Sequence, residues 1–351
     1  MSTDLNKILA FHTLVIGKQE SDKRRLAEIH KIDFDEYKRR IVGKEKEAEF
    51  LVILRALKAI NHIEAYDEEV SKITDEKTSD YKVELADGYK MLIEVKHTDK
   101  EKYSISGGNL QARIDFAKKM NLPLRFAISI KGYWGLFTVE YLQSKNGKIT
   151  LSDFISDKRM ASTWDNELET CSFLFPANIQ IKSVYAHNHP KSLGIGFEPY
   201  GELISYELTC NGKRIIRVKG EKSRNISTMI LIEALQDRLA NSEQEITQNN
   251  GYTVVVDKSN EINMIPEYKF LLAIIEHMDL SGLDTRDDNL SYVSTKKDFN
   301  YPTLEYIRIA MAILVQNGLD IIVFKGNNGY RFSDYQRSFW NKHISDSSVS
   351  E

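Results

Sequence analysis

The pattern of apolar and polar residues predicts helices at the start of the chain. Between residues 34 and 60, apolar side chains recur near the 3.6-residue period of a helix, while Glu and Lys occupy the opposite face. A Lys- and Arg-rich stretch from about residue 18 onward predicts a helical arm before this helix. Residues 64–70 lose the helical period and are typical of an extended strand.

The next apolar runs predict a β-hairpin. Residues 80–85 are typical of an extended segment, and residues 90–96 form a β-rich run with a continuous apolar centre. The dipeptide Asp87-Gly88, which lies between them, favours a tight turn. We therefore expect the two runs to pair as neighbouring strands.

A helix and two further strands complete the first predicted unit. Residues 109–120 have a helical pattern with Asn109 as the expected N-cap, and residues 124–130 and 135–139 are typical of short apolar strands. The order helix, hairpin, helix, strand is typical of an α/β unit in which the second helix is the crossover. This unit is expected to end near residue 145.

The middle of the chain is expected to be rich in β-structure. Its strand-like runs are residues 179–185, 203–208 and 213–219. One helix is predicted over residues 227–239, and the polar tract 241–251 is expected to be a linker or an exposed loop.

The last part of the chain predicts helices followed by a hairpin. Residues 266–278 and 302–318 are amphipathic helices, the first opened by proline and the second closed by glycine, with a shorter helix expected within 287–299. Residues 319–324 and 329–332, joined by a Gly-Asn-Asn-Gly turn, predict a hairpin. This order of elements resembles a winged helix-turn-helix domain.

The predicted fold class is therefore α/β, with a β-rich middle module and a winged-helix-like C-terminal domain. The expected domains are residues 1–145, 146–255 and 256–351, the last serving DNA recognition or dimerisation. The length of 351 residues agrees with two to three domains, since a domain takes about 150 residues.

Composition narrows the classes of partner. The chain has 48 Lys and Arg against 51 Asp and Glu, a net charge of −3, which excludes binding to nucleic acid or membrane through a generally basic character. No apolar run is long enough to span a bilayer, and the first residues lack the pattern of a signal peptide, so we expect a cytoplasmic protein with no membrane partner. Cys171 and Cys210, the two cysteines, fit a reducing compartment.

One constellation in the predicted hairpin points to phosphodiester chemistry. Asp80 lies 14 residues before Glu94, far enough for one turn and close enough to pair across it. Glu94 and Lys96 share one face of their strand, because strand side chains alternate. Two converging carboxylates repel each other unless a cation lies between them, and hard oxygen ligands favour Mg²⁺ or Mn²⁺. Lys96 beside such a cation can stabilise charge on an attacked phosphate or help to deprotonate a water.

A structural alternative is a solvated ion pair on an edge strand, with Asp80 capping a turn. Ile93 and Val95 disfavour it, because they place the strand in the centre of a sheet. A charged face is costly there unless it has a function.

These residues resemble the motif of the PD-(D/E)xK nuclease superfamily, present here as Ser79-Asp80 and Glu94-Val95-Lys96. Ser79 stands where many members have proline. Within the superfamily, residues 40–140 are most similar to archaeal Holliday-junction resolvases and related restriction-like enzymes. The resemblance implies a restriction-endonuclease-like mixed sheet flanked by helices.

The same enzymes have characteristic residues on two helices. Their first helix carries a Gly-Lys-rich start and an acidic residue, similar to residues 43–54 here. The apolar register favours Glu47 as this carboxylate, with Glu49 as the alternative. The family often places a glutamine on the helix after the Glu-x-Lys strand, and Gln111 matches it. Gln111 would orient the attacking water or Lys96.

The resemblance also implies a metal site. Asp80, Glu94 and the carbonyl oxygen of Val95 would hold Mg²⁺, for which Mn²⁺ would substitute. Glu47 would support a second metal ion or its waters. Lys96 would activate the water or stabilise charge at the phosphate.

Basic residues in two places are candidates for DNA binding. The run 213–224 holds six basic residues and one acidic residue, and its basic residues are Lys213, Arg214, Arg217, Lys219, Lys222 and Arg224. The C-terminal domain has balanced charge, so it could bind DNA only through a local face formed by Lys296, Lys297, Lys325 and Arg331. A solvated strand and a dimerisation module are the respective alternatives.

The segment His187-Asn188-His189 resembles the start of the JAMM metalloprotease motif. The downstream Ser and Asp of that motif fall here on Phe197 and Tyr200. We therefore expect a polar loop rather than a zinc site.

Taken as a whole, the resemblance predicts a Mg²⁺-dependent DNA endonuclease of the restriction or defence type. Cleavage of both strands of a duplex would call for two active sites and hence a homodimer. Two alternatives stay open. One is a structure-specific nuclease for branched DNA such as Holliday junctions, and the other is a catalytically inactive nuclease fold that binds DNA or regulates a partner.

Overall fold

The structure is a computed structural model that describes residues 5–66, 77–154, 162–188, 196–197, 199–219, 232, 235–236, 238–239, 242–277, 304–325, 328–332 and 334. These residues form a mixed α/β protein with several sheets. They divide into two compact units, one up to Glu169 and one from Thr170 onward. Within the described ranges, no helix has the length and apolar character needed to cross a membrane.

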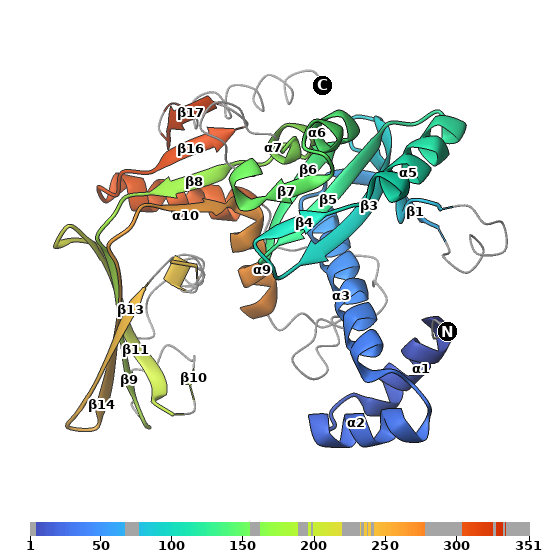
Figure 1. Ribbon diagram of the computed structural model, residues 1–351. Helices are drawn as coiled ribbons and strands as arrows, with labels where there is room; N and C mark the ends of the chain where they lie inside the picture. The colour runs from blue at the N-terminus through green and yellow to red at the C-terminus, as the bar shows by residue number, and fades with distance from the viewer. Residues whose placement is uncertain are drawn as a thin grey trace, which may run out of the picture. The chain divides into compact units, whose positions relative to one another are not determined.

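A five-stranded mixed sheet is the centre of the first unit (Figure 1). Its strands, in spatial order, are β1 (Ile60–Ala65), β2 (Tyr81–Leu85), β3 (Lys90–Thr98), β5 (Leu124–Ile130) and β6 (Tyr133–Thr138). β2 and β3 form an antiparallel hairpin, and β3 runs parallel to β5. Helix α5 (Gly107–Met120) connects the two parallel strands. The predicted hairpin and crossover helix are confirmed.

Strand β3 has the central place that its apolar residues predict. It pairs with β2 on one side and with β5 on the other. Ile93 is fully buried, and Val95 is 4% exposed. A charged side chain in the buried centre of this strand, such as Glu94, must therefore find partners inside the protein.

Helix α5 begins two residues earlier than predicted. Its N-cap is Ser106 rather than Asn109, and the Ser106 Oγ accepts a hydrogen bond from the Asn109 backbone N–H at 3.4 Å. Serine is as good an N-cap as asparagine, and Gly107 and Gly108 form the first turn of the helix. The helix ends at Asn121, whose left-handed conformation closes it.

Helix α3 (Phe34–Ala56) contacts different partners along its 23 residues. Asp33 caps its start, because its carboxylate accepts hydrogen bonds from the backbone N–H groups of Asp35 and Glu36. The first turns of α3 pack with α1 (Leu5–Val15) and α2 (Glu20–Ile29), an assembly that we call the helical cap. The core of the helical cap consists of Ile8, Phe11, Val15, Ala27, Ile32, Phe34, Tyr37 and Ile41.

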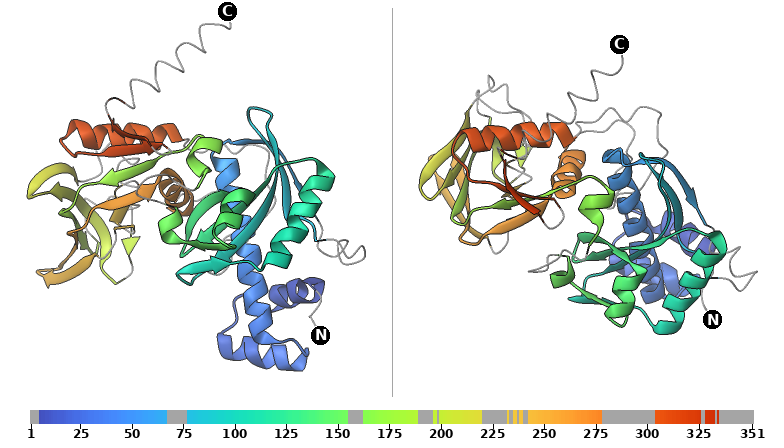
Figure 2. Two further views of the ribbon diagram at one scale, coloured as in Figure 1. Left: turned by 45° about the horizontal axis from the view of Figure 1, so that its top comes forward. Right: turned by 90° about the horizontal axis from the view of Figure 1, so that it is seen from above.

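The second half of α3 packs against the sheet. Phe50, Ile53 and Leu54 are fully buried. The Phe50 ring lies 5.4 Å from the Trp134 ring of β6 and 6.0 Å from the Trp164 ring of α7 (Trp164–Glu167), between ring centroids. Figure 2 shows α3 in blue, running without interruption from the helical cap to the sheet.

A short pair of strands, β4 (Lys102–Ser104) and β7 (Lys148–Thr150), is fixed by Asp153 in the turn η1 (Leu151–Asp153). The Asp153 carboxylate accepts hydrogen bonds from the Thr150 backbone N–H and from the hydroxyl of Tyr141 in α6 (Val139–Ser144), and it lies 2.8 Å from Lys145 Nζ. Burial alone would raise the pKa of Asp153, but these contacts outweigh burial and lower it to about 2. The charged form of Asp153 therefore stabilises the fold.

The second unit contains a larger antiparallel sheet. Its strands, in spatial order, are β10 (Gly196–Phe197), β11 (Gly201–Cys210), β9 (Ile179–Ala186), β14 (Tyr252–Ser259) and β13 (Glu243–Asn249), and β12 (Lys213–Lys219) also pairs with β11. The strands predicted over 179–185, 203–208 and 213–219 are confirmed. The prediction of a linker or loop over 241–251 is wrong, because β13 occupies most of this tract. All of β13 is exposed at the edge of the sheet, so its sequence lacks the alternation that marks a strand.

A four-stranded sheet joins distant parts of the chain in the second unit. Its order is β15 (Asn263–Pro266), β8 (Ser172–Phe175), β16 (Ile322–Lys325) and β17 (Asn328–Arg331). Helices α9 (Glu267–His277) and α10 (Leu304–Gln316) and the β16–β17 hairpin agree with the predicted elements. The helix expected within 287–299, and most of the helix expected over 227–239, lie outside the described residues.

The units differ from the three domains expected. β8 lies in the range expected for the middle module, yet it pairs with β15 and β16 from the range expected for the C-terminal domain. Both edges of β8 are used, so the two expected domains share one sheet. The boundary expected near residue 145 falls after Glu169.

We predict that Asp153→Asn lowers the free energy of unfolding by about 2 kcal/mol at pH 7. The folded-state pKa is depressed from 3.8 to about 2, so this contribution is complete above the unfolded-state pKa and is lost as the pH falls through about 2. Urea unfolding of the wild type and the variant at several pH values between neutral and strongly acidic tests this. The difference should shrink with acidity, and a difference independent of pH would contradict the assignment. Asp115→Asn, an exposed carboxylate, is the control.

Candidate active site

Asp80 and Glu94 lie across from each other at the open end of the β2–β3 hairpin. Tyr81 pairs with Ile93 in the antiparallel register, so Asp80, which precedes β2, is aligned with Glu94. The Asp80 side chain turns toward β3, where its Oδ2 accepts a hydrogen bond from the Val95 N–H at 2.7 Å. The hairpin thus brings the two carboxylates together.

The Lys96 ammonium contacts both carboxylates. Its Nζ lies 2.6 Å from Glu94 Oε1 and 3.6 Å from Asp80 Oδ2. Burial alone would lower the pKa of Lys96, but the two carboxylates outweigh burial and raise it above its ordinary value. Lys96 is therefore protonated at neutral pH, which suits it to stabilise negative charge rather than to accept a proton.

Glu94 is fully buried and has a second cation beside it. The Arg113 Nε of helix α5 contacts Glu94 Oε1. Burial, followed by the Asp80 carboxylate, raises the pKa of Glu94, while Lys96 and Arg113 lower it. With all four groups ionised, two negative and two positive charges cancel, which is a requirement for charges buried this deeply.

Tyr103 of β4 lies near the same four charged groups, which all act on its hydroxyl. Burial raises the pKa of Tyr103 to about 12. The phenol is therefore neutral near pH 7 and can donate a hydrogen bond. Its place beside the hairpin results from the β4–β7 pairing, for which the sequence has no local signal.

The oxygen atoms of this cluster are ligands of the kind that a hard divalent cation prefers. Glu94 Oε2 is buried without a hydrogen-bond partner among the described residues, an arrangement that is costly unless another ligand is present. The N–H and C=O groups of one residue point to the same side of a strand, so the Val95 carbonyl points to the Asp80 side. Across the described ranges, His, Cys, Asp and Glu side chains nowhere gather in a group of three or more suited to a metal ion. A metal here would therefore need the backbone oxygen as well as the two carboxylates.

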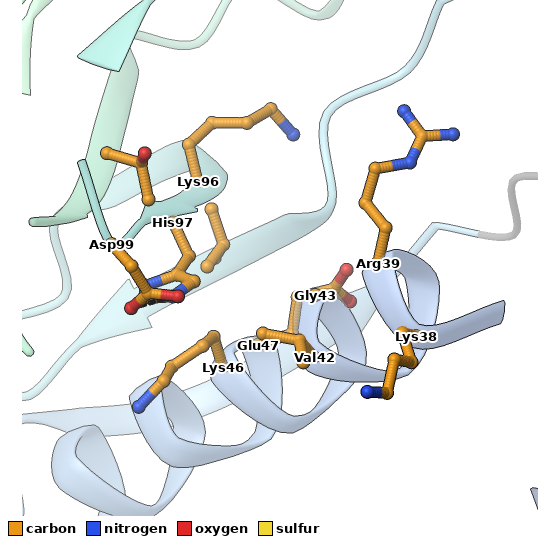
Figure 3. A pocket seen from close by; sticks show the side chains of 11 residues that line it. Lys38, Arg39, Val42, Gly43, Lys46, Glu47, Lys96, His97 and Asp99 are labelled. Carbon is orange, nitrogen blue, oxygen red and sulfur yellow. Dashed lines mark ion pairs between the residues drawn. The ribbon is translucent and has the colours of Figure 1, made fainter. Parts of the chain in front are cut away.

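A pocket of about 480 Å³ lies between the first half of α3 and the end of β3 (Figure 3). Glu47 from α3 and Lys96 from β3 both line it. Glu47 Oε2 accepts a hydrogen bond from the Tyr81 hydroxyl at 3.2 Å. Glu49 is engaged elsewhere, since its Oε1 accepts a hydrogen bond from Trp134 Nε1 at 2.8 Å. Of the two candidate helix carboxylates, Glu47 is the one that shares a pocket with Lys96.

Gln111 does not face the cluster. It is exposed on α5, and its Nε2 donates a hydrogen bond to Asp115 Oδ1 of the same helix at 2.8 Å. Arg113, two residues later, contacts Glu94 and so lies in the place expected for Gln111. The buried face of α5 consists of Leu110, Ile114, Phe116 and Ala117. Arg113 lies three residues after Leu110 and four before Ala117, so the helical period was the signal that could have identified it.

The predicted DNA-binding residues are described only in part. Lys222, Arg224, Lys296 and Lys297 lie outside the described residues. On β12, Lys213 and Lys219 are exposed, while Arg214 and Arg217 each lie 3.2 Å from Glu207 Oε2. One carboxylate therefore offsets part of the positive charge of this strand.

The remaining candidates do not form one face. Lys325 pairs with Asn328 at one end of the β16–β17 hairpin, and Arg331 pairs with Ile322 at the other. Residues 322 and 325 are an odd number apart, so the two basic side chains also point to opposite faces. In the JAMM-like segment, His187 is exposed and His189 lies outside the described residues.

The chain is similar to solved structures over part of its length. No protein-family model and no curated protein matches the chain. The solved structures that match include Hjc, a Holliday junction resolvase from the archaeal hyperthermophile Archaeoglobus fulgidus, with 21% sequence identity and a TM-score of 0.27. The match covers 31% of this chain and 89% of that chain. A likeness of this degree carries no argument about function.

We predict that Arg113→Met lowers the free energy of unfolding by about 3 kcal/mol, because it removes one of the two cations beside a buried carboxylate. Gln111→Met, an exposed change on the same helix, should change it by less than about 0.5 kcal/mol. Urea unfolding of both variants measures this difference. If both variants lower the free energy of unfolding by the same amount, the contact between Arg113 and Glu94 does not stabilise the fold.

Proposed function

We propose that the first unit is a metal-dependent nuclease that hydrolyses phosphodiester bonds in DNA. The observation that carries this proposal is the contact of the Lys96 ammonium with two carboxylates, Asp80 and Glu94, that lie opposite each other on neighbouring strands. The order of α3, the hairpin, the crossover helix and β5 supports a restriction-endonuclease-like arrangement. This is the arrangement that the PD-(D/E)xK resemblance implies.

In this proposal Asp80, Glu94 and the Val95 carbonyl hold Mg²⁺, and Mn²⁺ can substitute for it. The bound ion would supply Lewis-acid stabilisation of the phosphate and a more acidic water. Glu47 would contribute to a second ion or to its waters from across the pocket that it shares with Lys96. The buried Glu94 Oε2, which has no hydrogen-bond partner among the described residues, supports this assignment.

The protein's own residues have separable tasks. Lys96, protonated at neutral pH, stabilises the negative charge that develops on the attacked phosphate. Arg113 keeps Glu94 ionised and oriented. Tyr103 can donate a hydrogen bond to the phosphate or to a water.

We further propose a restriction or defence role, with two copies of the chain cutting the two strands of a duplex. Cleavage of branched DNA is the alternative substrate. In both cases the second unit would supply recognition, through the basic strand β12 and a winged-helix-like part formed by α9, α10 and the β16–β17 hairpin. Supercoiled plasmid, methylated and unmethylated, and a four-way junction distinguish these substrates.

We predict that Asp80→Asn and Lys96→Met each reduce Mg²⁺-dependent cleavage of DNA by at least about a hundredfold, because Asp80 would hold the metal ion and Lys96 would stabilise the charge on the attacked phosphate. Binding of DNA to Asp80→Asn in EDTA should be no weaker than binding to the wild type, since this change removes no phosphate contact. Gel assays of cleavage and fluorescence anisotropy measure the two quantities.

The matched control is the ion pair at the other end of the same hairpin, where Lys90 Nζ lies 3.1 Å from Glu84 Oε2. Glu84→Gln changes the charge of the hairpin without touching the site and should cleave like the wild type. Unchanged cleavage in Asp80→Asn or in Lys96→Met would overturn the proposed function.

A second candidate is a nuclease fold that no longer cuts and serves as a DNA-binding or regulatory module. The charge balance of the cluster favours it, because Lys96 and Arg113 already neutralise Asp80 and Glu94. The two candidates differ in whether the cluster takes up a metal ion.

If the first unit is a nuclease, we predict that Mn²⁺ at a concentration of about ten times its dissociation constant raises the free energy of unfolding by about 1.4 kcal/mol. Asp80→Asn should abolish this stabilisation, and Glu84→Gln should retain it. Thermal unfolding with Mn²⁺ and with EDTA measures the effect. Equal melting temperatures in both for the wild type would favour the module without catalysis.

A further inference from the structure

We propose that the pocket between α3 and β3 binds the sugar-phosphate backbone of DNA beside the bond that is cut. In this inference Arg39 is the phosphate ligand and Gly43 forms the wall against which the backbone lies. The identity of the ligand rests on the proposed function. The binding site itself rests on Arg39, Val42 and Gly43, which line the pocket and are not part of the catalytic cluster.

The first feature is a stripe of residues on α3 that faces the pocket. It consists of Arg39, Val42, Gly43, Lys46 and Glu47, which line the pocket at the spacing of one helix face. On a helix that covers a sheet, such a stripe is normally apolar. One turn later the stripe is indeed apolar, beginning with the buried Phe50. The part of the stripe up to Glu47 therefore does not pack against the sheet, and its polar side chains can contact a polar ligand.

The second feature is the glycine in this stripe. Gly43 lies inside a long helix, where glycine is less stable than alanine. A Cβ atom at this position would meet nothing within 4 Å, so packing against the protein does not require glycine here. A missing side chain at a pocket wall lets a ligand approach the backbone closely.

The third feature is that most cations lining the pocket already have an ionic partner, whereas Arg39 has none among the described residues. Lys46 pairs with Glu49, and Lys96 contacts Asp80 and Glu94. Arg39 is exposed and forms no ion pair or hydrogen bond with any residue that the structure describes. Figure 3 shows the charged ends of Arg39 and Lys96 rising on the same side of α3. Arg39 is therefore the cation most readily available to an anion.

The acidic side chains of the pocket have partners of their own. Glu47 Oε2 lies 2.9 Å from Lys44 Nζ, and Asp99 Oδ1 lies 3.1 Å from His97 Nε2. The His97 side chain is 9% exposed, and its Nδ1 is buried without a hydrogen-bond partner among the described residues. A polar atom in this state is satisfied by a ligand or a water.

These features match a nucleotide backbone better than a free anion. The Val42 side chain and the Gly43 Cα give a small apolar surface for a deoxyribose ring, and Arg39, one turn away, can bind the adjoining phosphate with two N–H groups. The pocket also contains Lys96, so a strand bound along α3 continues directly to the catalytic cluster. Its volume of about 480 Å³ is ample for one nucleotide unit.

The first test measures binding of the full-length protein to a short labelled duplex in EDTA, by fluorescence anisotropy over a range of salt concentrations. Arg39→Ala should bind about tenfold more weakly, and the slope of log Kd against log salt should fall by about one. Arg25→Ala, which removes the same charge from an exposed position on α2 outside the pocket, should bind like the wild type.

The second test fills the pocket from its glycine wall. Gly43→Ala should raise the melting temperature by about 2 °C, because alanine favours the helix. Gly43→Leu should fold with a melting temperature no lower than the wild type and bind the duplex about tenfold more weakly, because its side chain occupies the space of the ligand. A fall in melting temperature for Gly43→Ala would show that the glycine is required for packing and would overturn its role.

The outcomes separate this inference from the proposed function. If the wild type cleaves DNA but Arg39→Ala and Gly43→Leu bind normally, or if the wild type does not bind the duplex at all, the pocket assignment is overturned. If both variants lose binding while the wild type never cleaves with Mg²⁺ or Mn²⁺, the pocket assignment stands and the nuclease assignment fails.

Discussion

The complete burial of the Glu94 carboxylate is the constraint on which the first unit depends. A buried carboxylate costs several kcal/mol unless opposite charges surround it. Lys96 supplies one charge from the same strand, and Arg113 supplies another from the crossover helix. This requirement ties together the register of the hairpin, the start of β2 just after Asp80, and the rotation of α5 over the sheet. The fold and the candidate site are therefore consequences of the same electrostatic condition.

That condition also bears on how the cluster could take up a metal ion. A divalent cation would add two positive charges to a cluster that is already neutral, so its entry is favoured only if Lys96 or Arg113 moves away from Glu94. The Lys96 side chain is 28% exposed and the Arg113 side chain 17%, so each has a route toward solvent. The Lys96 or Arg113 side chain that leaves Glu94 would then be able to contact a bound phosphate. Metal uptake and substrate binding would then support each other.

The sequence predicted features that depend on local pattern and missed those that depend on distant pairing. The hairpin, the crossover and the alignment of Asp80 with Glu94 follow from alternation, a turn dipeptide and a spacing of 14 residues. Arg113 was not among the predicted site residues, because the family resemblance implies a glutamine on this helix and Gln111 matches it. Tyr103 owes its position to the pairing of β4 with β7, and β8 pairs with strands far along the chain. Such pairings leave no periodic signal, and β13, exposed on both faces, leaves none either.

The number of residues in helix α3 between the helical cap and the sheet sets how the cap is rotated relative to the sheet. Ile41 belongs to the core of the helical cap and Phe50 to the core under the sheet, and one uninterrupted helix joins them. Because a helix turns by about 100° per residue, one residue inserted between them would rotate the cap by that angle about the helix axis and carry Arg39 out of the pocket. Insertions or deletions here are therefore tolerable only when they amount to whole turns.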